Sequence, residues 1–148
     1  MAESYSRILV HIVFGTKYRK KTIPENLHFR LYAYMRQTCI IKDCAPLAIN
    51  GTSDHVHVFC SLGRSIPVAR LVQSIKSASS KWIQKNSGNS DFKWQRGYGA
   101  FSVSYYEPEK VISYIINQKT HHRCRSFRDE LIDLFYQCGV EFRDEYLD

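Results

Sequence analysis

Two histidines in one strand-like segment are the first candidates for chemistry. The segment GTSDHVHVFCSL (residues 51–62) begins with turn residues and continues with valines and a phenylalanine, which favour a β-strand. Alternate side chains of a strand point to opposite faces, so His55 and His57 share one face, with Cα atoms about 6–7 Å apart. Two such imidazoles can bind one metal ion from the same side, although an isolated His-x-His pair is also compatible with a structural role.

A tyrosine and a glutamine lie on a later segment, EPEKVISYIINQKTHH (residues 107–122), which is predicted to be a helix that begins near Pro108. At about 100° per residue, its apolar side chains form one buried stripe: Val111, Ile112, Ile115 and Ile116. Tyr114, Gln118 and His121 follow the i, i+4, i+7 pattern and form a second stripe on the flank of the first. The Tyr114 hydroxyl is therefore expected to reach a polar partner, unless the tyrosine is only a boundary aromatic.

Taken together, these residues predict a reaction at a phosphodiester. Two imidazoles and the amide oxygen of Gln118 provide three ligands and leave open positions, as a catalytic metal requires. Mixed nitrogen and oxygen ligation suits Mn²⁺ or Mg²⁺. Beside such an ion, Tyr114 could attack the phosphorus while the 3′-oxygen leaves. The bond energy would remain in a phosphotyrosine ester, so the strand could be rejoined to another 3′-OH without a nucleotide cofactor.

Charge is distributed unevenly along the 148 residues. The formal net charge is +7, but residues 1–128 carry 20 basic and 7 acidic side chains, whereas residues 129–148 carry one basic and seven acidic side chains. A basic body is expected of a protein that contacts phosphate backbones, and an acidic tail can pack against such a body or reach a partner subunit. The 44% hydrophobic content excludes a disordered chain.

The sequence also limits the compartment and the number of domains. No apolar run approaches the about 20 residues needed to cross a bilayer, and the N-terminus lacks a signal-peptide pattern. Five cysteines without a CxxC pair are predicted to be reduced thiols, namely Cys39, Cys44, Cys60, Cys124 and Cys138. We therefore predict one cytoplasmic domain over residues 1–148 with no membrane partner.

The predicted elements follow the order β-α-β-β-α-β-α-α. Strands are expected within residues 8–14, 44–51, 55–62 and 92–106, and helices within 23–43, 65–86, 107–122 and 126–139. The first six elements, residues 1 to about 106, favour an α+β fold with a ferredoxin-like (split βαβ) antiparallel sheet and helices on one face. The tyrosine helix (about 107–122) and the acidic C-terminal helix and tail (about 126–148) are extra to that core. They are expected to cover an edge or to cross to a second copy.

An ordered set of motifs resembles a known family across nearly the whole chain. The set comprises HIVFGTKYRKK, DHVHVF, LVQSIKSASSKWI, WQRGYGAFSVS, VISYIINQKTHH and SFRDELIDLFYQCGVEFRDEYLD. It resembles the small single-tyrosine transposases of the HUH class (His-hydrophobe-His), the IS200-like transposases, which mobilise insertion sequences as single-stranded DNA. The His-x-His pair alone is a weak motif, whereas the ordered set with Tyr-x-x-x-Gln on the last core helix is specific.

The resemblance implies a role for each matching residue. It makes His55 and His57 metal ligands, Gln118 the third ligand and Tyr114 the nucleophile that forms a 5′-phosphotyrosine bond. His121 matches no firm family role and is a possible auxiliary at the phosphate. The divalent ion would be Mg²⁺ or Mn²⁺.

The resemblance also implies partners. Family members grip DNA hairpins near the element ends, cleave nearby single strands and form a homodimer in which each tyrosine helix works against the partner's histidines. The candidate DNA-binding residues are Lys17, Tyr18, Arg19, Lys20, Lys21, Lys76, Lys81, Lys93 and Arg96. Tyr18, Trp94 and Tyr98 could stack on bases or belong to the core boundary.

Two other functions are compatible with the sequence. One is a related HUH enzyme without its own mobile element, such as a domesticated endonuclease acting on repeated hairpins or a replication-initiation nuclease. The other is a non-catalytic ferredoxin-like module that only binds nucleic acid. The enzymes require the Tyr114 hydroxyl and a divalent ion, whereas the binding module requires neither.

Overall fold

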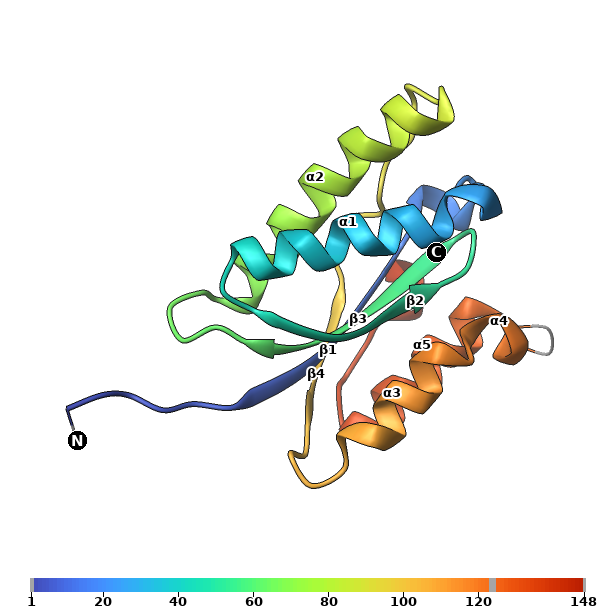
Figure 1. Cartoon of the computed structure of the whole chain (residues 1–148). Helices are drawn as coiled ribbons and strands as arrows, with labels where there is room; N and C mark the ends of the chain where they lie inside the picture. The colour runs from blue at the N-terminus through green and yellow to red at the C-terminus, as the bar shows by residue number, and fades with distance from the viewer. Residues whose placement is uncertain (1, 123–124, 148) are drawn as a thin grey trace.

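The computed structural model describes residues 2–122 and 125–147 (Figure 1). Its strands are β1 (Ile8–Gly15), β2 (Ala45–Gly51), β3 (His55–Leu62) and β4 (Gly99–Val103). Its helices are α1 (His28–Ile41), α2 (Val68–Ser87), α3 (Pro108–Ile116), α4 (Gln118–His121) and α5 (Phe127–Cys138). Short 3₁₀ helices span Lys17–Arg19, Glu25–Leu27 and Asp144–Tyr146.

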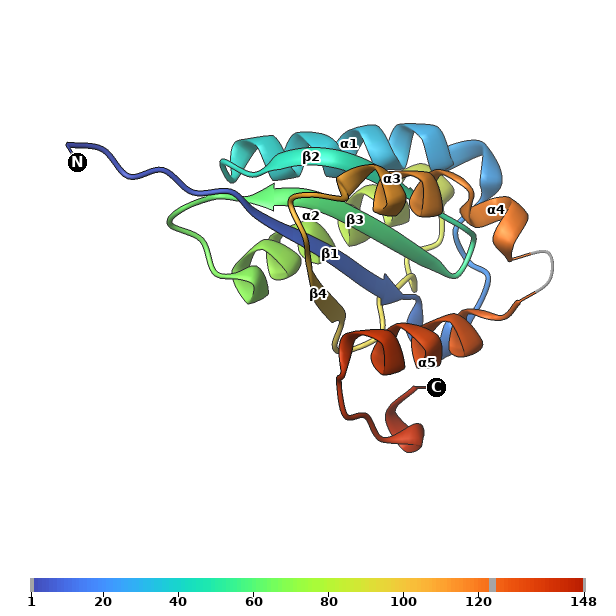
Figure 2. The same cartoon turned by 90° about the horizontal axis from the view of Figure 1, so that it is seen from below.

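The strands form one antiparallel sheet in the order β2-β3-β1-β4. This order is that of the split βαβ arrangement, so the predicted ferredoxin-like α+β fold is confirmed. Helices α1 and α2 cover one face, as expected for the core, while α3, α4 and α5 lie on the opposite face (Figures 1 and 2). The extra C-terminal helices therefore give the sheet a third layer.

The apolar core lies between the sheet and helices α1 and α2. On β1 the residues at Val10, Ile12 and Phe14 face these helices, and on β3 Val56 and Val58 do so, because alternate residues of a strand share a face. They pack against buried side chains of both helices, including Leu31, Met35, Leu71, Val72 and Ile75. The intervening positions of β1 and β3 consequently point to the other face, and these positions include the histidines.

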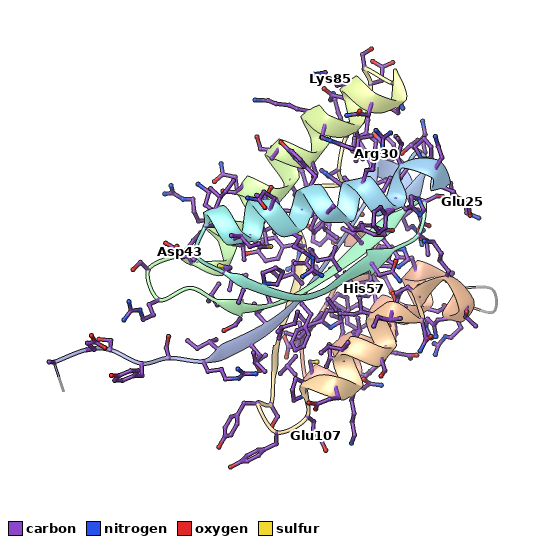
Figure 3. The ribbon with its side chains drawn as sticks, in the orientation of Figure 1. Glu25, Arg30, Asp43, His57, Lys85 and Glu107 are labelled. Carbon is purple, nitrogen blue, oxygen red and sulfur yellow. The ribbon has the colours of Figure 1, made fainter. Side chains whose placement is uncertain are left out.

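The face of the sheet that α3, α4 and α5 cover carries two apolar patches, with a polar centre between them. Phe101 of β4 packs with Phe127 and Leu131 of α5, and Phe59 of β3 packs with Ile115 of α3. Between these patches the sheet presents three buried histidines, His11, His55 and His57. Figure 3 shows His57 on the side of the sheet that faces α3. The C-terminal helices thus enclose the polar residues of the sheet.

The tyrosine helix differs from its predicted form. It is interrupted at Asn117, so that α3 carries the tyrosine and α4 begins at the glutamine. The side-chain amide of Asn50 donates hydrogen bonds to the carbonyls of Ile115 and Ile116, at 3.0 and 2.9 Å, and so ties the end of α3 to β2. Ile116, predicted to be buried, is 61% exposed, because its position on this short helix faces away from the sheet.

The last strand is also shorter than predicted. Of residues 92–106 only Gly99–Val103 pair as β4, whereas Trp94 forms an isolated bridge with Thr16. The preceding loop is fixed from α2 by the ammonium of Lys76, which donates to the carbonyls of Gln95 and Gly97. By contrast, α5 begins and ends as predicted, with Ser126 Oγ accepting from the Asp129 N–H at 3.1 Å and Gly139 in the left-handed region.

Two smaller predictions concern cysteines and membranes. Cys39, Cys44, Cys60 and Cys138 are free thiols, and Cys124 lies outside the described residues. Among the described residues, every helix is too short or too polar to span a bilayer.

Candidate metal and tyrosine site

The two strand histidines present the same nitrogen to a shared centre. His55 Nδ1 is held from behind by Asp54 Oδ1 at 2.7 Å and by the Thr52 hydroxyl at 3.0 Å. His57 Nδ1 lies 2.8 Å from His11 Nε2. Both Nε2 atoms are therefore free of these partners and point inward. Metal-binding histidines are commonly oriented in this way, with the second ring nitrogen bonded to a carboxylate or another polar group.

The tyrosine and the glutamine reach the same centre from α3 and α4. Gln118 Oε1 lies 3.1 Å from His55 Nε2, and the Gln118 amide donates to Glu130 Oε2 at 3.0 Å. The Tyr114 hydroxyl donates to the same carboxylate oxygen. The other carboxylate oxygen, Oε1, lies 3.0 Å from His57 Nε2. The four residues singled out from the sequence thus come together in one chain, joined through Glu130 of α5.

Two further histidines approach this carboxylate from the end of α4. His121 Nε2 lies 3.4 Å from Glu130 Oε2, so the predicted auxiliary residue is at the site. His122 Nε2 lies 3.2 Å from Glu130 Oε1, yet this buried nitrogen has no hydrogen-bond partner in the described part of the chain. An unpaired buried imidazole nitrogen that faces other nitrogen and oxygen donors is suited to bind a cation.

The site is buried by tight packing of α5 against the sheet. The side chains of His55, His57 and Gln118 are fully buried, and Glu130 is 2% exposed. The Phe127 ring stacks on the His55 imidazole with centroids 4.0 Å apart and planes 7° apart. Opposite His55 in the β1–β3 register lies Gly15, where a Cβ atom would come within 2.8 Å of the Phe127 ring. Glycine at this position therefore leaves room for the aromatic cover of the histidine.

The electrostatics of the centre favour positive charge. Burial works against the charged form of His55, but the carboxylates of Asp54 and Glu130 outweigh it and raise the pKa of His55 to about 9. Burial raises the pKa of Glu130, but the close approach of the surrounding histidine nitrogens dominates and holds this pKa well below its ordinary value. Without a metal, the site therefore keeps a proton on His55 beside an ionised Glu130, and a divalent cation could take the place of that proton.

His57, His11 and Tyr114 stay neutral at pH 7. Burial lowers the pKa of His57 to about 4 and that of His11 to about 3, against the opposing charge of Glu130. Burial and the nearby negative charge of Glu130 raise the pKa of the Tyr114 hydroxyl. Neutral imidazole is the form that binds a metal, whereas Tyr114 needs a nearby positive charge before its oxygen can act as a nucleophile.

These shifts predict a maximum in the stability of the metal-free protein near pH 6.5, the ordinary pKa of histidine. The folded state holds an extra proton on His55, so its contribution is complete below pH 6.5 and is lost as the pH rises towards about 9. His57 stays neutral in the fold, so stability is lost as the pH falls from 6.5 towards about 4. Urea midpoints measured with EDTA across this range test the prediction, and a flat profile above pH 6.5 would contradict the raised pKa of His55.

Two hollows border the centre. A cavity of about 250 Å³ borders Tyr114, His121 and Glu130 and is flanked by the cations Lys110 and Arg125. A larger one of about 760 Å³ borders Asp54 and His122. Its rim carries Tyr18, Arg19, Lys21, Lys119 and Arg125. The basic segment that follows β1 therefore lies beside the histidines, where a phosphate backbone can approach.

The remaining DNA-binding candidates lie around α2 and the loop before β4. Lys93, Arg96 and Tyr98 border a separate hollow of about 520 Å³. Lys76 also borders it, but its ammonium is already bonded to loop carbonyls. Trp94 packs edge-on against two phenylalanine rings and donates to Ser79 Oγ at 3.0 Å, so its contacts are those of a core residue. The side chains of Lys17, Lys20 and Lys81 are exposed.

The sequence interpretation missed four residues of this centre: His11, Asp54, His122 and Glu130. His11 could have been found, because it alternates with the core residues of β1 and the predicted topology places β1 beside the histidine strand. Glu130 also carried a signal, since it lies three residues after Phe127 and next to Leu131, in the middle of the apolar stripe of α5. An acid at such a position is buried and needs partners.

Comparison with known proteins identifies the family. The sequence matches the family described as "Transposase IS200 like" over residues 4–118. The chain belongs to this family of transposases. The IS200-like match includes both strand histidines, the tyrosine and Gln118, and it ends before the two later histidines and Glu130.

Two curated relatives and two solved structures support the assignment. The transposases for insertion sequence element IS200 of Salmonella typhimurium and Salmonella typhi are each 26% identical over 114 residues, covering 73% of this chain and 74% of theirs. The crystal structure of a protein from Deinococcus radiodurans R1 that is described as a transposase has a TM-score of 0.62 at 19% sequence identity. The match covers 78% of this chain and 93% of that chain. The structure of a REP-associated tyrosine transposase bound to a REP hairpin has a TM-score of 0.60 at 13% sequence identity. The match covers 81% of this chain and 72% of that chain. The structural likenesses concern the fold.

Proposed function

We propose that this IS200-like transposase cleaves and rejoins single-stranded DNA at hairpin-marked element ends through a 5′-phosphotyrosine at Tyr114. The observation that supports the proposal most is the convergence of the Tyr114 hydroxyl and the Gln118 amide on the Nε2 side of the strand histidines. A phenol held beside possible metal ligands is the arrangement that a tyrosine nucleophile requires. Membership in a transposase family supplies the substrate class.

In the proposed reaction the Tyr114 oxygen forms a bond to the scissile phosphorus and the bond from phosphorus to the 3′-oxygen breaks. The phenolic proton is lost and the leaving 3′-oxygen gains one, so charge and atoms balance. The 5′-phosphate remains on the tyrosine until another 3′-OH reverses the step. Lys110 and Arg125 border the cavity at the hydroxyl, where they pair with Glu107 and Asp133. A phosphate that enters this cavity would compete with these carboxylates for their positive charge.

A divalent ion, Mg²⁺ or Mn²⁺, would be held by His55, His57 and Gln118. When bound, such an ion polarises the phosphoryl oxygen and stabilises the negative charge that develops in the transition state. The donor set fits this role because the Nε2 atoms and the amide oxygen face one centre, while Asp54 and His11 hold the imidazoles from behind.

The proposed substrate is a DNA hairpin with an adjoining single strand, by analogy with the structural relative that was solved on a REP hairpin. The basic rim beside the site, including Arg19, Lys21 and Lys119, is suited to the phosphates of that strand. The exposed ring of Tyr18 is available for stacking on a base. We also propose that the protein is cytoplasmic, which accords with a DNA substrate in the cell.

The direct experiment uses a set of hairpin oligonucleotides with single-stranded flanks and either Mg²⁺ or Mn²⁺. A protein–DNA adduct that survives a denaturing gel is expected, and EDTA should abolish it. Absence of any adduct with wild-type protein that binds the hairpin would favour the non-catalytic binding module. Subterminal hairpins in the flanking genomic DNA would separate a transposase of its own element from a domesticated endonuclease or a replication-initiation nuclease.

We also propose a homodimer in which each tyrosine helix acts in trans, on the histidines of the partner subunit. Within the one chain described here, the tyrosine already reaches its own histidines through Glu130, which supports a site completed in cis as the alternative. Mixing equal amounts of His57→Gln and Tyr114→Phe proteins distinguishes these assemblies. Exchange between dimers restores adduct formation if the tyrosine acts in trans, and an inactive mixture indicates a site built from one chain.

A further inference from the structure

Glu130 occupies an unusual position in this centre. It lies on α5, beyond the part of the chain that matches the family, yet its carboxylate contacts the side chains from three other elements of the site. A buried carboxylate costs folding free energy unless its charge is compensated. Packing alone gives no reason for an acid here, because its neighbours on the helix, Phe127 and Leu131, are apolar core residues.

The two carboxylate oxygens face different partners. Oε1 faces imidazole nitrogens, at 3.0 Å from His57 Nε2, 3.5 Å from His55 Nε2 and 3.2 Å from His122 Nε2. Oε2 accepts hydrogen bonds from the Tyr114 hydroxyl and the Gln118 amide. One side of the carboxylate is thus directed at possible metal ligands and the other at the proposed nucleophile.

The distances on the Oε1 side match those between neighbouring ligands of one ion. Donor atoms bound at about 2.0–2.2 Å in tetrahedral or octahedral geometry lie about 3.0–3.5 Å apart. Ligand atoms of His55, His122 and Glu130 all lie within 4.8 Å of one another. The His122 nitrogen that has no hydrogen-bond partner among the described residues faces the same point.

We propose that Glu130 is itself a ligand of the divalent cation, with Oε1 joining the Nε2 atoms of the surrounding histidines while Oε2 orients the Tyr114 hydroxyl. This inference rests on the proposed function and extends its ligand set to the C-terminal helix. A set with two or three imidazoles and one carboxylate favours Mn²⁺ over Mg²⁺, because Mg²⁺ prefers oxygen ligands and keeps its water. The fold of α5 against the sheet would then be part of the metal site.

The test is a Mn²⁺ titration of the full chain without DNA, in which electron paramagnetic resonance measures the free ion. Glu130→Gln keeps the shape and removes the charge, and it should raise the Kd for Mn²⁺ at least about tenfold. Asp129→Asn makes the same change one residue away on the exposed side of α5 and should leave the Kd unchanged.

A second pair of variants covers the case in which Glu130→Gln does not fold, as judged by circular dichroism. Glu130→Asp retains the charge on a shorter side chain, and His122→Gln removes a partly exposed imidazole; both should weaken Mn²⁺ binding. Electron spin echo envelope modulation of bound Mn²⁺ detects coupling to ligand nitrogens. The His122 variant should show one such nitrogen fewer than the wild-type protein.

The possible outcomes separate this inference from the proposed function. Wild-type Mn²⁺ affinity in a folded Glu130→Gln protein, with only the melting temperature lowered, would overturn the inference and leave a structural role. A wild-type chain that binds no Mn²⁺ would also overturn it. Weakened Mn²⁺ binding in the variant would support the inference even if the wild-type protein formed no DNA adduct, and that absence would count against the proposed function alone.

Discussion

Replacing Tyr114 with phenylalanine is expected to abolish the covalent adduct with single-stranded DNA, a loss of more than about 10³-fold. The ring and its packing remain, but the oxygen that would bond to phosphorus is gone. Hairpin binding should persist, because the basic rim lies on other segments of the chain. Adduct yield on denaturing gels and hairpin affinity by fluorescence anisotropy measure the two properties separately.

Tyr136→Phe is the matched control, since this tyrosine of α5 is 75% exposed and lies outside the centre. It should form adduct at the wild-type rate. Loss of the Tyr114 hydrogen bond to Glu130 is expected to lower the free energy of unfolding by about 1–2 kcal/mol, so the variant remains folded for the assay. Undiminished adduct formation by Tyr114→Phe would eliminate this residue as the nucleophile.

The second large effect is expected from His57→Gln. His57 is fully buried and its Nε2 faces the centre, 3.0 Å from Glu130 Oε1. Removing this donor should weaken Mn²⁺ binding on the order of 100-fold and reduce the adduct in proportion at a fixed, limiting Mn²⁺ concentration. Raising the Mn²⁺ concentration should recover part of the adduct, which a titration of yield against metal would reveal.

His28→Gln provides the control for loss of a buried histidine. His28 lies on α1, where its Nε2 is 3.1 Å from the Ile23 carbonyl, and it lines the hollow with the basic rim but contacts neither His55 nor His57 in the described interactions. Its replacement should lower stability without changing the metal dependence. If the adduct formed equally well in EDTA, or if both variants had the same metal response, the role of His57 as a ligand would be refuted.

The sequence was sufficient to predict the fold and the positions of those residues that follow a simple helical or strand periodicity. Alternation along the histidine strand predicted that His55 and His57 share one face, and the structure places both on the face opposite the α1–α2 core. Tyr114 and Gln118 were predicted to share a helical stripe, and both now contact Glu130, although a break at Asn117 separates their helices. The two side chains keep their helical spacing across the break because the backbone at Asn117 is nearly helical.

The rest depended on tertiary contacts that no local pattern encodes. The break at Asn117 is fixed by Asn50 on a distant strand, and the length of β4 is limited by the loop that Lys76 holds. The position of α5 could not be predicted, because an amphipathic helix fits any exposed apolar surface. Consequently the sequence did not place Glu130 in the site, whereas the structure places it at the centre.

Mass spectrometry of the trapped adduct tests the central claim most directly. After cleavage of a hairpin oligonucleotide with Mn²⁺, nuclease and protease digestion should leave a nucleotide linked through its 5′-phosphate to the peptide that contains Tyr114. The released strand should end in a free 3′-OH. A nucleotide on any other residue, or a released strand that ends in a 3′-phosphate, would contradict the account.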